Sequence, residues 1–143
     1  MVIAIINGPN LNMLGKRKPS IYGRETLEEL NEYLKKSFPE ITLTFFQSNG
    51  EGEIIDYIQT LDADGGVINA GGYTHYSVAI RDAIEARSDI PFAETHLSDI
   101  SEREDFRKVS LLTDVCVATF MGEGKESYVK AIKFLSEKIN DDF

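Results

Sequence analysis

The chain has 143 residues, which is enough for one domain with a hydrophobic core and too few for two. Its net charge of −9 excludes the basic surface that binds nucleic acid and disfavours binding to an acidic membrane surface. No apolar run approaches the ~20 residues of a membrane-spanning helix, and the single cysteine, Cys116, allows no internal disulfide. We therefore expect one cytoplasmic domain over residues 1–143, binding neither nucleic acid nor membranes, with Cys116 as a buried, inert thiol.

The elements begin, in chain order, with a β-branched run over residues 2–6, which is typical of a strand buried on both faces. A loop over residues 7–23 follows, and the capping-box pair Thr26 and Glu29 predicts a helix that ends near Pro39. Four further strands are expected at 41–46, 66–69, 91–95 and 115–120. Apolar residues at helical spacing predict the remaining helices, with inner faces that carry Ile54, Ile58 and Leu61; Ile80, Ala83 and Ile84; and Tyr128, Ile132, Leu135 and Ile139.

Strands and helices alternate along the chain, and this rhythm predicts a parallel sheet covered by helices on both faces. For a chain of this length we expect a flavodoxin-like, doubly wound α/β domain with five strands in the order 2-1-3-4-5. The carboxyl ends of such strands meet at one edge of the sheet, where ligands bind.

Polar residues follow the predicted strands at this edge. They are Asn7, Asn10, Gln47, Ser48, Asn49, Asn69, His75, Glu94, His96 and Ser98. Both histidines of the chain are among them, so the clustering predicts a functional site. Structural explanations stay open: His75 as the partner of a backbone carbonyl, and Asn69 as a turn residue.

Glu94 and His96 are two residues apart at a strand end, so their side chains point the same way. A carboxylate beside an imidazole fixes the tautomer of the ring and favours its protonated form, which suits a general acid. With His75, the pair also matches a two-histidine, one-carboxylate metal site, although the spacing is not distinctive.

The segment 7–23 is long for a loop in a compact domain, and such loops are often lids. It carries Arg17 five residues before Tyr22. A guanidinium stabilises a tyrosinate, which makes a general base from a group whose ordinary pKa is about 10. The alternative is a solvated basic loop with a structural tyrosine. Taken alone, the residues of this stretch favour that alternative.

A second capping box, Ser101 with Glu104, predicts a short helix on which Arg103 and Arg107 share one side. The two arginines form either an anion site or ion pairs with nearby glutamates. Asp82 lies on a helix whose other face is apolar, so exposure to solvent is its simplest explanation.

The motifs NGPNLNMLG, QSNGEGEIID, NAGGYTHYSVAIRDA, ETHLSD and REDFRKVS occur in this order across nearly the whole chain, with Arg17 and Tyr22 between the first two. In these motifs the chain resembles the type II 3-dehydroquinate dehydratases. The resemblance implies a flavodoxin-like fold, a dodecamer built from trimers, and dehydration of 3-dehydroquinate to 3-dehydroshikimate in the shikimate pathway. It implies no metal, no cofactor and no Schiff base.

The resemblance also implies roles for individual residues. Tyr22 takes a proton beside the ketone, Arg17 stabilises the tyrosinate and the enolate, and Asn10 holds the enolate oxygen through a water. His96, oriented by Glu94, protonates the departing hydroxyl. The substrate-binding residues are Asn69, His75, Asp82 from a neighbouring subunit, the backbone of Leu97 and Ser98, and Arg107.

The chain departs from the usual family pattern at Lys18, Ala70, Gly72, Tyr76, Asp99 and Ser127, none of which replaces an expected catalytic group. Two other readings compete with the dehydratase: a flavodoxin-like module that binds a small molecule without turnover, and, more distantly, a metal-dependent hydrolase.

Overall fold

The computed structural model describes residues 1–16, 18–22 and 24–141, without the side chains of Pro19 and Tyr22. Its centre is a parallel sheet in the order β2-β1-β3-β4-β5, which confirms the predicted topology. The strands are β1 (Val2–Asn7), β2 (Thr42–Gln47), β3 (Gly65–Asn69), β4 (Phe92–His96) and β5 (Ala118–Met121).

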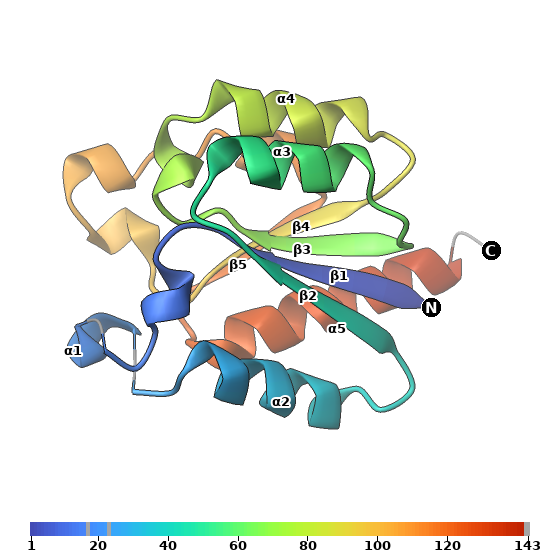
Figure 1. Ribbon diagram of the computed structural model, residues 1–143, viewed down its shortest axis with the longest axis horizontal. Coiled ribbons are helices and arrows are strands. Elements are labelled where there is room, and N and C mark those ends of the chain that lie inside the picture. The colour runs from blue at the N-terminus through green and yellow to red at the C-terminus, as the bar shows by residue number, and fades with distance from the viewer. Residues whose placement is uncertain (17, 23, 142–143) are drawn as a thin grey trace.

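Helices cover both faces of the sheet (Figure 1). One face carries α3 (Glu51–Gln59) and α4 (Val78–Ala86), and the other carries α2 (Leu27–Ser37) and α5 (Lys125–Asp141). The fold is therefore the expected doubly wound, flavodoxin-like one. None of the helices in the described ranges combines the length and apolar character needed to cross a membrane.

Alternate side chains of β1 enter two separate cores. Ile3 and Ile5 pack in the core beneath α2 and α5, whereas Ala4 and Ile6 pack beneath α3 and α4. All four are fully buried. The continuous apolar run in the sequence thus reflects a central strand that is covered on both sides.

The helix α2 begins as its sequence predicts. The backbone N–H of Glu29 donates to Thr26 Oγ1 at 3.2 Å, and the N–H of Thr26 donates to the Glu29 carboxylate at 3.3 Å. The helix ends at Ser37, two residues before Pro39. This reciprocal cap fixes where the chain re-enters the domain after the loop over residues 7–23.

Two local predictions between β4 and β5 are wrong. Ser101 does not cap a helix, because Asp99 caps the turn instead and accepts a hydrogen bond from the Ser101 N–H at 2.9 Å. The segment forms two separate 3₁₀ turns, η3 (Ile100–Glu102) and η4 (Asp105–Arg107), in place of one helix.

The last strand begins at Ala118, three residues later than expected, because Thr113–Val115 form the 3₁₀ turn η5. Cys116 lies between this turn and the strand and is partly buried. Burial, with the nearby Glu94 and Asp114 carboxylates, raises the pKa of its thiol to about 12. The thiol therefore stays protonated, as expected of an inert cysteine.

The loop over residues 7–23 has more structure than expected, since it contains the 3₁₀ turn η1 (Leu11–Met13) and the one-turn helix α1 (Pro19–Tyr22). Its first residues pack tightly on the end of β3: a Cβ on Gly8 would lie 2.5 Å from the carbonyl oxygen of Ala70. Only glycine allows this approach, which brings the ends of β1 and β3 together.

Candidate active site

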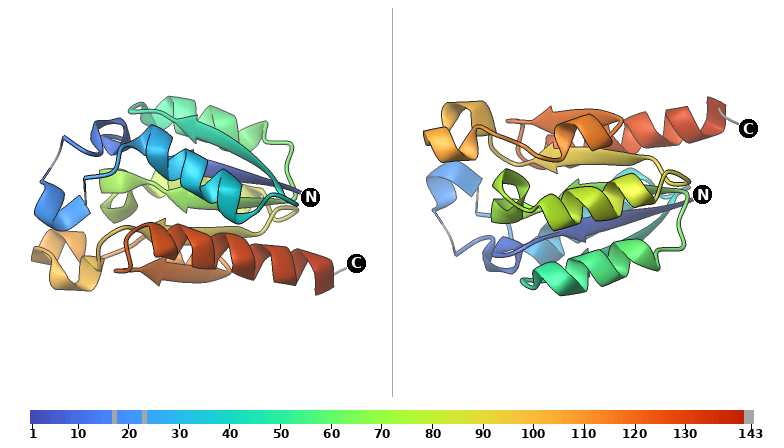
Figure 2. Two further views of the ribbon diagram at one scale, coloured as in Figure 1. Left: turned by 90° about the horizontal axis from the view of Figure 1, so that it is seen from below. Right: turned by 90° about the horizontal axis from the view of Figure 1, so that it is seen from above.

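All five strands point toward the same edge of the sheet (Figure 1). The views of Figure 2 show α1 and the turns η3 and η4 side by side at this end, on the far side from the C-terminus. A cleft opens here, lined by Leu11, Asn69, Gly71, Gly72, His75, His96, Leu97, Ser98, Ile100, Arg103 and Arg107. The cleft thus gathers residues that follow β1, β3 and β4, as the topology predicts.

A buried polar contact at the cleft joins His96 to Glu94. The Nε2 atom of His96 lies 2.6 Å from Oε2 of Glu94, and the two residues are 5% and 0% exposed. Burial alone raises the pKa of the Glu94 carboxyl, but hydrogen bonds from His96, Ser110 and Thr113 outweigh burial and hold that pKa below its ordinary value. Glu94 is therefore ionised at neutral pH and able to stabilise an imidazolium.

Asn69 and Tyr128 form a buried polar chain beneath the cleft. The Asn69 amide donates to the Tyr128 hydroxyl at 3.0 Å, and the hydroxyl donates to Asn7 Oδ1 at 2.5 Å. The side-chain Oδ1 of Asn69 accepts from the Gly71 N–H at 3.1 Å. The sequence left open whether Asn69 is a turn residue or a site residue, and the structure shows that it is part of the turn and also lines the cleft.

His75 contacts the main chain as one reading of the sequence predicted. Its Nδ1 lies 2.8 Å from the carbonyl oxygen of Val109, which leaves Nε2 as the other polar atom of a ring that lines the cleft. Across the part of the chain that the structure describes, no three His, Cys, Asp or Glu side chains are grouped as metal ligands.

The two arginines reach the cleft from separate turns. Arg103 donates to Ser98 Oγ at 3.2 Å, and Arg107 Nε lies 2.5 Å from the Glu104 carboxylate. The Arg107 contact is an ion pair and not an aligned hydrogen bond, because the Nε–H has no acceptor in hydrogen-bond geometry within the described residues. Arg107 therefore both pairs with a glutamate and lines the cleft, so the two alternatives are compatible.

Not every expected site residue lies in the cleft. Asn10 is exposed on the rim, in a left-handed conformation with φ of 72°, directly before the lining residue Leu11. Asp82 is exposed on α4 and is not among the residues that line the cleft. Arg17 lies outside the described residues, and for Tyr22 only the backbone, at the end of α1, is described.

Sequence reasoning missed the hydroxyl groups around Glu94. Ser110, Thr113 and Thr119 all donate to its carboxylate, from three different segments. Thr119 stands directly opposite Glu94 in the β4–β5 register, so a correct alignment of these strands would have found it. The other two contacts depend on turns whose course the sequence did not predict.

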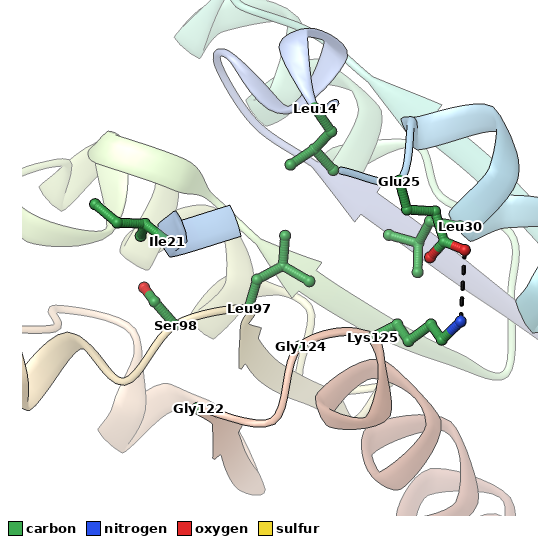
Figure 3. A pocket seen from close by; sticks show the side chains of 9 residues that line it. All are labelled: Leu14, Ile21, Glu25, Leu30, Leu97, Ser98, Gly122, Gly124 and Lys125. Carbon is green, nitrogen blue, oxygen red and sulfur yellow. Dashed lines mark hydrogen bonds and ion pairs between the residues drawn. The ribbon is translucent and has the colours of Figure 1, made fainter. Parts of the chain in front are cut away.

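A second cavity of about 460 Å³ adjoins the cleft and shares Leu97 and Ser98 with it. Figure 3 shows Leu14, Leu30 and Leu97 around this space, with Ile21 of α1 at one side. An ion pair between Lys125 and Glu25, 3.4 Å long, closes the opposite side. The loop over residues 7–23 thus has open space between itself and the domain.

A flavodoxin-like domain whose carboxyl edge combines a buried carboxylate–imidazole pair with amides and arginines has the groups of an acid–base enzyme for a small anionic molecule. The sequence model described as Dehydroquinase class II matches residues 1–136, and the chain belongs to this family.

Known proteins of the family resemble the chain over almost its whole length. The 3-dehydroquinate dehydratase of Fusobacterium nucleatum is 49% identical, with 98% of this chain and 99% of that protein covered. The crystal structure of a type II dehydroquinase from Butyrivibrio crossotus has a TM-score of 0.89 at 48% identity, covering 95% of this chain and 97% of that one. The structure of a second type II dehydroquinase, from Propionibacterium acnes, has a TM-score of 0.90 at 33% identity, covering 95% and 96%.

Proposed function

We propose that the cleft dehydrates 3-dehydroquinate, the reaction that the relatives' name describes. We propose further that the product is 3-dehydroshikimate, that the reaction is a step of the shikimate pathway, and that it takes place in the cytoplasm. The observation that carries the proposal is the buried contact of 2.6 Å between His96 and Glu94 beside Asn69, His75 and Arg107. The reaction needs a base for a weakly acidic hydrogen, a stabilised oxyanion and an acid for a poor leaving group.

The acid is His96. In its protonated form it gives a proton to the hydroxyl that leaves as water, while the ionised Glu94 stabilises the imidazolium and orients the ring. The position of Glu94 supports this role, because a fully buried carboxylate beside the ring cannot be screened by water.

The base is Tyr22, as its phenolate. It takes the proton from the carbon beside the ketone, and the electron pair moves to the ketone oxygen to form an enolate. Arg17 stabilises both the phenolate and the enolate, and Asn10 holds the enolate oxygen through a water molecule. When the C–O bond breaks, the electron pair returns to form the conjugated enone, with the proton of His96 on the departing oxygen.

The remaining groups hold the substrate. Arg107 binds its carboxylate, and Asn69, His75 and the backbone of Leu97 and Ser98 bind its carboxylate and hydroxyl groups. The loop over residues 7–23 closes over the ring and excludes water, and the cavity beneath Ile21 offers it room to move.

Asp82 acts on a neighbouring subunit. Its exposure on α4, away from the cleft of its own chain, is what we expect of a residue that reaches a second site. The assembly is a dodecamer of four trimers, in which this contact ties activity to assembly.

The test is the ultraviolet absorbance of the conjugated enone product. We expect Tyr22→Phe to bind substrate nearly as well as the wild type but to lose several orders of magnitude in kcat, because a phenyl ring cannot take a proton. Tyr57→Phe is the control, since its ring stacks on Phe46 and neither residue is among those that line the cleft. A wild type that binds 3-dehydroquinate without turnover would support the binding module, and near-normal turnover of Tyr22→Phe would refute the role of Tyr22.

A further inference from the structure

The Glu94 carboxylate accepts hydrogen bonds from four side chains. Its Oε2 atom accepts from His96 Nε2 and Ser110 Oγ, both at 2.6 Å. Its Oε1 atom accepts from Thr113 Oγ1 at 2.7 Å and from Thr119 Oγ1 at 3.1 Å. A carboxylate has about four lone-pair sites, so these donors fill its capacity and fix its plane.

Ser110 also receives a hydrogen bond, from the backbone N–H of Leu112 at 3.2 Å. This contact occupies an oxygen lone pair and leaves the hydroxyl proton to point at Glu94. The serine therefore acts as a donor to the same oxygen that contacts His96, and the two compete for the charge of that oxygen.

We propose that Ser110, Thr113 and Thr119 are positioning residues for the reaction, which act through Glu94 to orient His96 and to set how tightly the pair holds its proton. The inference rests on the proposed role of His96 as the acid. Three neutral donors share the charge of the carboxylate, so His96 receives only part of it and gives up its proton more readily.

The segment that carries Ser110 also holds the other histidine. On one side of Ser110, the Val109 carbonyl contacts His75 Nδ1 at 2.8 Å; on the other, the Leu111 N–H donates to the Thr74 carbonyl at 2.9 Å. Three consecutive residues thus contact His75, the Glu94 partner of His96, and Thr74, so Ser110 lies in a segment that touches the surroundings of both histidines.

Among the residues that the structure describes, few charged or titratable groups surround the pair. The Cys116 thiol lies near Glu94 and stays protonated, and His75, Arg103 and Arg107 line the same cleft as His96. The neighbouring residue of β3, Ile68, is apolar, and the neighbour on β5 is Thr119 itself. The hydroxyl groups are therefore the main polar influence on Glu94 besides His96.

The test is the pH titration of His96, followed by NMR of protein labelled with ¹⁵N-histidine; the chain has only two histidines, and His75→Asn assigns them. We expect Ser110→Ala and the near-isosteric Thr113→Val and Thr119→Val to raise the midpoint of the Glu94–His96 pair by on the order of one pH unit each. The basic limb of kcat should move up by the same amount, with KM changed less than about twofold. Thr113→Ser and Thr119→Ser keep the hydroxyl and should restore wild-type behaviour.

Thr95→Val is the matched control. Thr95 lies between Glu94 and His96 on β4 and is fully buried, and its Oγ1 has no hydrogen-bond partner within the described residues. For Thr95→Val we expect no shift in the titration midpoint of the Glu94–His96 pair and none in the basic limb of kcat. If a valine variant fails to fold, Ser110→Ala still decides the question.

Two outcomes separate this inference from the proposed function. A wild type that dehydrates the substrate, with a His96 titration that none of the hydroxyl variants moves, would overturn the inference alone. A shifted titration without any dehydration by the wild type would overturn the proposed function and leave the positioning of His96 by the hydroxyl groups standing.

Discussion

Removing one oxygen atom from the interior tests the link between the core and the cleft. Tyr128 is fully buried, and its hydroxyl bridges Asn7, which is 1% exposed, and Asn69, which is 5% exposed. Burial raises the pKa of Tyr128 well above its usual value, so the hydroxyl keeps its proton and donates it to Asn7. Tyr128→Phe leaves the ring in place and removes both hydrogen bonds.

The expected loss follows from the two groups left behind. Asn7 Oδ1 and Asn69 Nδ2 become buried without this partner, and each such group costs about 1–3 kcal/mol. We expect Tyr128→Phe to lower the free energy of unfolding by about 2–4 kcal/mol, which allows for some relaxation of the amides. Because Asn69 lines the cleft, KM should rise a few-fold as well.

Urea unfolding followed by circular dichroism measures the loss, with an unchanged m-value showing that only stability has changed. Tyr57→Phe is the control, because its hydroxyl makes no hydrogen bond to the described residues, and we expect a change within about 0.5 kcal/mol. A Tyr128→Phe protein as stable as this control would refute the reasoning, since it would mean that the amides find other partners at no cost.

Two further predictions concern charge. Arg107→Ala should raise KM about 10–100-fold with a smaller effect on kcat, because it removes a charge-assisted contact to the substrate carboxylate. Initial rates against substrate concentration measure both constants. The control is Lys108→Ala, which removes an exposed neighbouring charge paired with Asp105 and should change KM and kcat little. Because the pKa of Glu94 is lowered on folding, its contribution to stability is complete above the ordinary value of about 4.5 and is lost as pH falls below it. Unfolding measured between pH 7 and 3 should therefore show a steeper loss for the wild type than for Glu94→Gln, and parallel curves would contradict this assignment.

The sheet was predictable because its pattern is local and repeated. The fully buried run of β1 and the capping pair of Thr26 and Glu29 each identify an element without reference to the rest of the chain. Predictions failed between β4 and β5, where short 3₁₀ turns replace a helix. Such turns are stabilised by individual side chains, as Asp99 does for η3, and not by a periodic apolar face.

The candidate site was predictable only in part. The spacing of Glu94 and His96 on one strand was sufficient to predict their contact, because side chains two residues apart share a face of a sheet. No local pattern connected Glu94 with Ser110 or Thr119, which lie 16 and 25 residues away. The roles of Arg17 and Tyr22 stay predictions, because their side chains lie outside the described residues.

By itself, the sequence determined the alternation of strands and helices, the polar residues at the strand ends and the family resemblance, since these depend on residue type and short spacing. Only the tertiary structure decided that Asn7, Asn69 and Tyr128 share one hydrogen-bonded chain and that three hydroxyl groups surround Glu94. The physical reason is that most buried polar groups form hydrogen bonds with whatever lies beside them in the folded protein. Here the partners come from segments that are distant in the chain and become neighbours only when the sheet is assembled.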